Sequence, residues 1–169
     1  PLGLTRSHPF WEWSFTDELD ALPDDVLQDL DLCVCALYTN LGLSEKEQTE
    51  WVLAAMENPN FNIFAHPTAR RLNERGPIEI DLDRIIEAAV ETGCFLELNA
   101  QPERLDLNDV FCKRAKELGL TIVIGADAHS AEGLNFLRYG VDQARRGWLA
   151  PDDVLNTKPW DEIAPLFDR

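Results

Sequence analysis

Apolar residues in this chain gather in short runs, and segments with helical spacing lie between the runs. Four of the runs are apolar almost throughout, which predicts strands buried on both faces. They cover residues 32–37, 61–65, 94–98 and 120–125. Helical spacing and capping residues predict helices at 23–30, 44–57, 81–92 and 108–118, and shorter ones at 131–137, 141–146 and 152–155.

Several predicted helices carry recognisable end signals. Ser44 and Glu47 have the spacing of a capping box, in which each side chain bonds the other residue's backbone N–H. Gly93, Gly119 and Gly147 follow the last turns of three other helices, where glycine is a common cap. We expect these helix ends to lie close to the marked residues.

Strands that alternate with helices indicate right-handed βαβ units and a parallel sheet, so we expect an α/β fold. Four strands are too few to close a barrel, which usually needs about eight. Either the irregular, aromatic start of the chain adds strands, or the chain is part of a larger architecture. We divide the chain into a divergent segment, 1–22, and one domain, 23–169.

The net charge of −16 bears on function. A surface this acidic repels phosphate backbones and disfavours unaided tight binding to nucleic acid. It fits a divalent-cation site, an acidic scaffold, or simply a soluble acidic surface. No apolar run is long enough to cross a membrane, so we expect no membrane partner.

The cysteines predict buried free thiols in a cytoplasmic protein. They are Cys33, Cys35, Cys94 and Cys112, and none belongs to a Cys-x-x-Cys pair of the kind found in structural zinc sites.

Two of the three histidines stand just after predicted strands, where α/β folds build their sites. Asp127 and His129 follow one strand at a spacing that offers two ligands to one metal, and His66 follows another. A carboxylate with imidazoles suits Mn, Zn or Fe better than Ca or Mg. Alternatively, Asp127 or Ser130 caps the next helix, and His66 is structural.

Other polar residues share these strand ends. Glu97 and Asn99 lie on one face of a strand, and Glu97 is a metal ligand, a carboxylate that orients a histidine, or the partner of Arg104. We favour the orienting role. Tyr38 ends the first strand and is a poor metal ligand because of its high pKa, so we expect it to pack beside the site.

Arginines cluster in the polar loop after His66. Arg70, Arg71 and Arg75 could receive a phosphate, for which guanidinium groups are suited, or they could simply be solvated. The chain has no glycine-rich phosphate loop and no Gly-x-Ser-x-Gly elbow, so serine or cysteine nucleophile chemistry is not indicated.

Five stretches together resemble a PHP (polymerase and histidinol phosphatase) domain, specifically the one at the C-terminus of bacterial family X DNA polymerases. They are Ala65-His66-Pro67-Thr68, Leu96-Glu97-Leu98-Asn99-Ala100, Arg104-Leu105-Asp106-Leu107, Asp127-Ala128-His129-Ser130 and the segment from Arg138 through Arg145-Arg146-Gly147-Trp148 to Leu155-Asn156-Thr157. The likeness runs in order from about Pro23 to the end of the chain.

This resemblance implies a distorted, TIM-like (β/α) barrel that binds up to three metal ions, usually Mn or Zn, and cleaves phosphoesters. In the polymerase relatives it implies a 3′–5′ exonuclease and end-processing activity on DNA. His66, Asp127 and His129 then match metal ligands, Asp127 and His129 stand at the reaction centre, and Glu12 matches the family's glutamate ligand. Glu97 and Asn99 match a family signature that carries no ligand role.

The chain also departs from the family. It has no His-x-His pair, and Tyr38 stands where the family has a histidine. The resemblance therefore implies an incomplete barrel with fewer Mn or Zn sites. Three hypotheses follow: a phosphoesterase with a degraded metal site, a non-catalytic PHP-like module, and a barrel whose open sheet edges are covered by another chain or by self-association.

Overall fold

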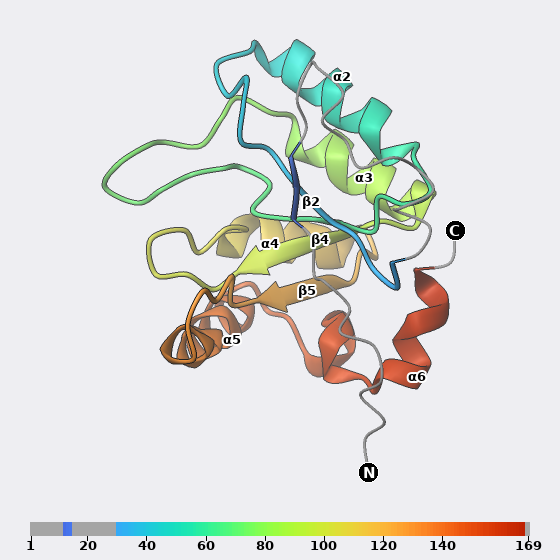
Figure 1. The fold of residues 1–169 in the computed structure, drawn as a ribbon, viewed down its shortest axis with the longest axis vertical. Coiled ribbons are helices and arrows are strands. Elements are labelled where there is room, and N and C mark those ends of the chain that lie inside the picture. Colours follow the sequence, from blue (N-terminus) through green and yellow to red (C-terminus); the bar gives the residue numbers. More distant parts are fainter. Residues whose placement is uncertain (1–11, 15–29, 168–169) are drawn as a thin grey trace.

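The computed structural model describes residues 12–14 as backbone and residues 30–167 with side chains. Its sheet has five parallel strands in the order β1-β2-β3-β4-β5 (Figure 1). The strands are β1 (Glu12–Ser14), β2 (Val34–Ala36), β3 (Ile63–Phe64), β4 (Phe95–Asn99) and β5 (Ile122–Gly125). All four strands expected from the apolar runs are present; β2, β3 and β5 are shorter than their runs, and β4 has the expected length but starts and ends one residue later.

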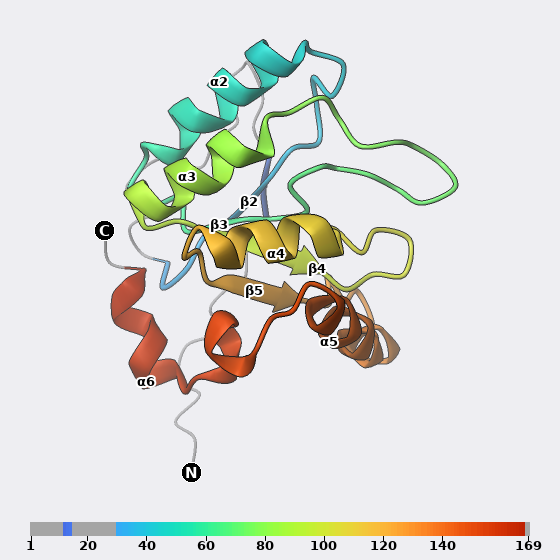
Figure 2. The same ribbon diagram turned by 180° about the vertical axis from the view of Figure 1, so that it is seen from behind.

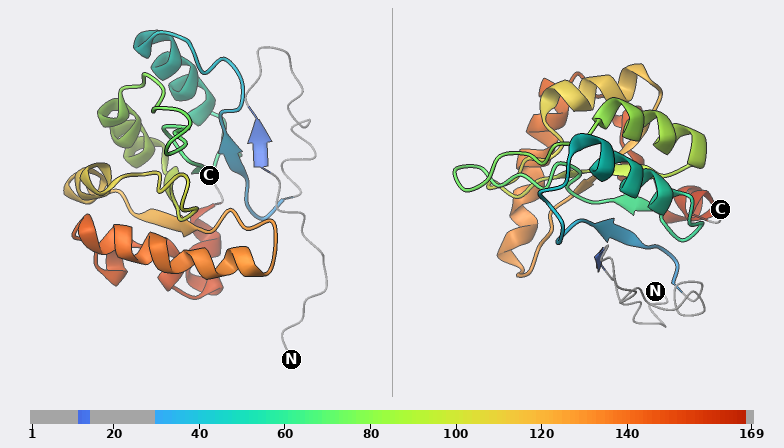
Figure 3. Two further views of the ribbon diagram at one scale, coloured as in Figure 1. Left: turned by 90° about the vertical axis from the view of Figure 1, so that its left-hand side faces the viewer. Right: turned by 90° about the horizontal axis from the view of Figure 1, so that it is seen from above.

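The strand order equals the chain order, so each connection leads to the neighbouring strand. The helices are α2 (Glu45–Met56), α3 (Leu82–Thr92), α4 (Asp109–Glu117), α5 (Leu137–Arg146) and α6 (Trp160–Ile163). Helices α2, α3 and α4 cover one face of the sheet, as Figure 3 shows. The α/β prediction is confirmed, and the arrangement is compatible with part of an α/β barrel.

Side chains alternate between the two faces of β2, which explains why its run is apolar throughout. Cys33, Cys35 and Leu37 belong to the core under the helices. Val34 and Ala36 face the other way and pack with Leu155, Ile163 and Phe167 from the end of the chain. The C-terminal segment thus covers part of the second face of the sheet.

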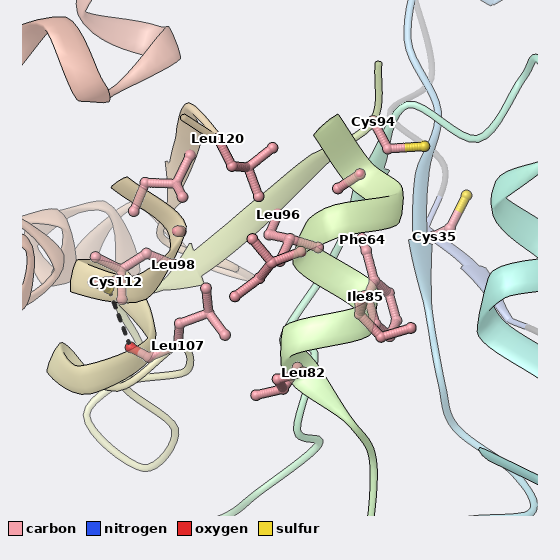
Figure 4. Close-up of a cluster of buried hydrophobic side chains, with 14 of the residues drawn as sticks. Cys35, Phe64, Leu82, Ile85, Cys94, Leu96, Leu98, Leu107, Cys112 and Leu120 are labelled. Atoms are coloured by element: carbon pink, nitrogen blue, oxygen red, sulfur yellow. Dashed lines mark hydrogen bonds between the residues drawn. The ribbon is translucent and has the colours of Figure 1, made fainter. Parts of the chain in front are cut away.

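The main core fills the space between β3–β5 and the helices (Figure 4). Its fully buried members include Phe64, Ile85, Leu96, Leu98 and Leu107. All four cysteines are buried and none forms a disulfide, as the sequence predicts. Burial raises the pKa of the Cys112 thiol to about 12, and the neighbouring Asp109 carboxylate adds to this effect.

The helix-end signals act as predicted. Ser44 and Glu47 form the capping box at the start of α2. Asp81 and Asn108 cap α3 and α4 through backbone N–H groups of the first turn. Gly93 closes α3 with a φ of 76°, a conformation that favours glycine. No helix in the described part of the chain has the length and apolar content needed to cross a membrane.

The C-terminal third differs from the prediction. The helix expected at 141–146 starts earlier, at Leu137, and the segment before it is a 3₁₀ turn, Glu132–Phe136. Two more 3₁₀ turns replace the helix expected at 152–155, and α6 was not expected. Such short turns have no helical periodicity for a sequence pattern to detect. The helix expected at 23–30 falls almost wholly outside the described residues.

Candidate active site

The predicted site residues meet at the carboxyl edge of the sheet, toward which the arrowheads of β4 and β5 point in Figure 1. Asn99 ends β4, and Asp127 follows β5 by two residues. His66 and Tyr38 each stand two residues past the ends of β3 and β2. Parallel strands bring their carboxyl ends together, so four separate segments contribute to one site.

A chain of hydrogen bonds links three of these segments. The Glu97 carboxylate accepts the backbone N–H of His66 through Oε2 at 2.9 Å. The Asn99 amide donates to the same oxygen and to Asp127 Oδ2, both at 3.2 Å. Glu97 therefore fixes the backbone at His66 rather than its ring. Arg104, the other partner considered for Glu97, instead lies near Asp127.

Glu97 is almost completely buried, and this sets its acidity. Burial raises its pKa to about 7, a rise that His66 and the hydrogen bonds from His66 and Asn99 partly oppose. Gly125 makes room for the carboxylate, because a Cβ there would lie 2.0 Å from Glu97 Oε1. A protonation change at Glu97 near neutral pH would act directly on the segments that hold His66 and Asp127.

His66 is buried, with a φ of 32°, and its ring meets that of Tyr38 edge-on at 5.6 Å between centroids. Tyr38 is about half exposed and so forms an outer wall of the His66 pocket. This is the packing role expected for Tyr38.

His129 is the exposed residue of the site and lies beside Asp127, whose side chain is largely buried. His129 Nδ1 lies 3.0 Å from the Asp127 carbonyl oxygen and 3.8 Å from its carboxylate Oδ1. Because a carbonyl oxygen only accepts, Nδ1 carries the proton in this contact and Nε2 is the basic nitrogen of the neutral ring. The side chain of His129 is 85 % exposed.

The loop arginines hold the loop itself. Arg70 donates through Nε to the Arg104 carbonyl at 2.7 Å and also to the Leu105 carbonyl. Arg75 donates to the Ala69 carbonyl. Arg71 pairs with Glu74 at 3.1 Å and Glu103 at 3.0 Å. Of the three arginines that could receive a phosphate, Arg71 lines the cleft described next, while Arg70 and Arg75 are bonded to backbone carbonyls.

A cleft of about 450 Å³ opens beside Asp127. Its walls come from the loop after β3, the loop after β4 and the segment after β5, and they include Arg71, Gln101, Glu103, Arg104, Asp127, His129 and Ser130. A second, more apolar cavity of about 350 Å³ lies along the other face of the sheet and reaches Glu97, Asn99 and Asp127. The site residues thus stand between two openings.

Three residues of this region had no predicted site role: Gln101 and Asp106 were given none, and Arg104 was considered only as a partner of Glu97. Gln101 donates to the carbonyls of Ala126 and Asp127, both at 2.7 Å, and so ties the loop after β4 to the segment after β5. Asp106 is fully buried and accepts the Thr68 N–H at 2.9 Å. Arg104 faces Asp127 across 3.7 Å. Arg104 and Asp106 lie in a quoted family stretch and Gln101 directly follows another.

The predicted metal ligands are only partly brought together. Within residues 30–167 no three His, Cys, Asp or Glu side chains gather closely enough to hold a metal ion. Asp127 and His129 are neighbours, and the Glu12 side chain lies outside the described residues. Metal sites usually take at least three protein ligands, so the described side chains alone do not fit a Mn or Zn centre.

Comparison with known proteins places these observations in a family. No family model matches the chain. It is 36 % identical over 159 residues to a DNA polymerase/3′–5′ exonuclease PolX of Bacillus subtilis, covering 90 % of this chain and 28 % of the polymerase. It is 27 % identical over 146 residues to a probable phosphatase of Thermoanaerobacter sp. strain X514, covering 80 % of this chain and 57 % of the phosphatase.

A probable phosphatase of Acetivibrio thermocellus is 30 % identical over 116 residues, which are 64 % of this chain and 45 % of that protein. The chain therefore spans between about a quarter and three-fifths of these relatives' lengths. The motifs at the strand ends and these similarities show that the chain belongs to the PHP family. A family X DNA polymerase is among its relatives.

Proposed function

We propose that this chain is a PHP-type phosphoesterase domain of the 3′–5′ exonuclease or DNA end-processing type, with a reduced Mn or Zn site. The observation that carries the proposal is the Asp127–His129 pair, held at the carboxyl edge of the sheet by Asn99 and Gln101. The names of the relatives, an exonuclease-containing polymerase and probable phosphatases, support the same reaction class.

The chain's own residues divide the work of such a site. His129 presents Nε2 to the cleft edge and can move a proton to or from a phosphoester oxygen. Asp127 orients His129 through its backbone carbonyl. Glu97 and Asn99 hold the segments after β3 and β5 in register with each other. Arg71 supplies positive charge to the wall of the cleft.

The test is metal-stimulated hydrolysis of a phosphodiester, such as bis-p-nitrophenyl phosphate or a short single-stranded DNA, with Mn or Zn. His129→Ala should lower turnover by at least a hundredfold, in line with loss of a proton-transfer group. Arg84→Ala, on the outer surface of α3, is the matched control and should keep wild-type turnover. Absence of cleavage at millimolar metal would refute the proposal.

A second function is a non-catalytic PHP-like module, and one observation favours it. Arg104 places its positive charge 3.7 Å from the Asp127 carboxylate, where a metal ion would compete with it. Elemental mass spectrometry after equilibration with Mn and Zn separates the two functions. Bound metal that disappears in a His66→Ala/His129→Ala double variant supports the phosphoesterase. A folded, metal-free wild type supports the module.

We also propose that another chain or a second copy completes the barrel. The described sheet has the chain-order topology of consecutive barrel units but does not close. Uncovered sheet edges and apolar faces favour association. Sedimentation velocity tests this directly, and a strictly monomeric species over a wide concentration range would count against it.

A further inference from the structure

The guanidinium group of Arg104 is largely buried and lacks the partners that such a cation usually has. Its side chain is only 14 % exposed. Within the described residues its N–H groups donate no hydrogen bond, and Nη1 is buried without a partner. Its one ion pair, to Asp127, is 3.7 Å long and lies beyond hydrogen-bond range. Buried charges are normally paired and hydrogen-bonded.

This arginine lies on a polar cleft whose geometry is fixed from several sides. Gln101 bonds the carbonyls of Ala126 and Asp127, and Arg70 bonds the carbonyl of Arg104 itself. The lining of the cleft also includes Arg71, whose Nε is buried without a partner in the described part of the chain. The backbone that carries Arg104 is therefore held in place while its donors remain unused.

We infer that this cleft binds an oxyanion of the phosphate class directly through Arg104, without a bridging metal ion. A guanidinium fork matches two phosphate oxygens. Arg104 also offsets the charge of Asp127, which would otherwise repel an anion from the cleft. Glu103 engages Arg71 at 3.0 Å, and this neutralises the second carboxylate in the wall. The inference rests on the proposed function for the phosphoester ligand, but it assigns the binding step to an arginine.

The experiment is calorimetric titration of the whole chain with inorganic phosphate in EDTA. Wild type should bind, Arg104→Gln should bind at least tenfold more weakly, and Arg84→Gln should stay within twofold of wild type. Arg84 is the matched control because it is another arginine with one ion pair, to Glu50 at 3.0 Å on the outer surface of α3. Unchanged affinity in Arg104→Gln, or binding that needs Mn or Zn, would overturn the inference.

Asp127→Asn should have opposite effects on phosphate affinity if the anion binds directly to Arg104 and if it binds through a metal ion held by Asp127. Removing this carboxylate frees Arg104 and lowers the repulsion, so phosphate affinity in EDTA should rise at least threefold. If a metal held by Asp127 carried the anion instead, wild type would not bind phosphate in EDTA, and Asp127→Asn would abolish the binding seen with added Mn or Zn. This variant decides the question if circular dichroism shows that Arg104→Gln does not fold.

The outcome is independent of the turnover assay for the proposed function. Phosphate binding in EDTA without any Mn-stimulated hydrolysis would support this inference and refute the catalytic proposal. Hydrolysis that appears while phosphate fails to bind in EDTA would do the reverse.

Discussion

Glu97 shows how one buried side chain organises the site. Its carboxylate lies in the interior because Gly125 leaves space for it, and it joins the backbone of His66 to the side chain of Asn99. Burying a carboxylate disfavours its charged form, so the protonated state is favoured in the folded protein. Because its pKa is about 7, Glu97 becomes charged near physiological pH, and the energetic cost of the buried charge appears there.

The pH dependence of stability should carry this signature. The folded pKa of Glu97 lies above its ordinary value of 4.5, so the folded state holds a proton that the unfolded state has lost between these values. Stability should therefore fall as pH rises from about 4.5 to 7. Glu97→Gln keeps a side-chain oxygen that accepts the His66 N–H but has no charge to bury. The variant should therefore be spared up to about 3 kcal/mol of the stability that wild type loses as pH rises.

Urea unfolding of wild type and Glu97→Gln at pH 5 and pH 8, in EDTA, measures this difference. The variant should gain stability relative to wild type at pH 8 and gain much less at pH 5. A difference in free energy of unfolding that is the same at both pH values would contradict the assignment.

At the residue scale, the sequence correctly predicted which polar residues follow strand ends. It did not predict what each of their side chains contacts. Asp127, His129 and His66 were found because strand ends collect functional groups. Arg104 has no such signal, since it sits in a loop whose path depends on tertiary contacts. The bond from Glu97 to the backbone of His66 was also beyond reach, because a pattern of residue types does not specify backbone partners.

At the scale of elements, the outer edge of β5 is covered by the C-terminal segment (Figure 2). Asn156 accepts the N–H of Ile124 at 3.1 Å and donates to its carbonyl at 2.9 Å, as a neighbouring strand would. Ile122 forms a parallel bridge with Val154. This gives a physical reason for the Leu155-Asn156-Thr157 stretch and protects the edge from unwanted pairing.

Asn156→Ala should therefore weaken β5 as an element. The change removes two hydrogen bonds and leaves the Ile124 backbone without a partner at the edge, at a cost of about 1–3 kcal/mol. Thermal unfolding measures the loss, and sedimentation velocity should show increased self-association. Asn135→Ala, on the exposed 3₁₀ turn, is the control and should change stability by less than about 0.5 kcal/mol. Equal effects of the two changes would rule out the edge role.

A substitution at Gly147 tests how closely α5 packs against α4. A Cβ at this position would lie 2.5 Å from Cys112 Cβ and 3.0 Å from the Asp109 carbonyl oxygen. Gly147→Ala should cost about 1–3 kcal/mol, as overpacking usually does. Gly42→Ala, which meets nothing within 4 Å, should leave stability nearly unchanged. Chemical denaturation distinguishes them, and a neutral Gly147→Ala would show that the two helices can move apart.

The elements predicted best are those with local signals. The helix caps at Ser44 and Gly93 place α2 and α3 within a residue of their observed ends. Three of the four expected strands, β2, β3 and β5, are shorter than their apolar runs because burial continues past the last ladder bond, as at Leu37. The segment after residue 147 was missed because its 3₁₀ turns are shaped by packing against the sheet rather than by periodicity.

At the scale of the whole molecule, the charge of −16 opposes the proposed substrate. Long-range repulsion acts on every phosphate of a DNA strand, whereas the arginines of the cleft act on one or two. The Debye length falls from about 30 Å at 0.01 M salt to about 8 Å at 0.15 M. Salt should therefore remove the repulsion while it screens the partly buried Arg104 much less.

Single-stranded DNA should consequently bind more tightly as salt increases, the reverse of ordinary nucleic-acid binding. A fluorescent 20-mer should gain several-fold in affinity between 10 and 150 mM salt, while inorganic phosphate should change little. Fluorescence anisotropy and calorimetry measure the two ligands. A DNA affinity that falls steadily with the logarithm of salt concentration would instead indicate counterion release from a basic surface. That result would mean that local positive groups outweigh the net charge, and the cleft arginines would be the first to examine.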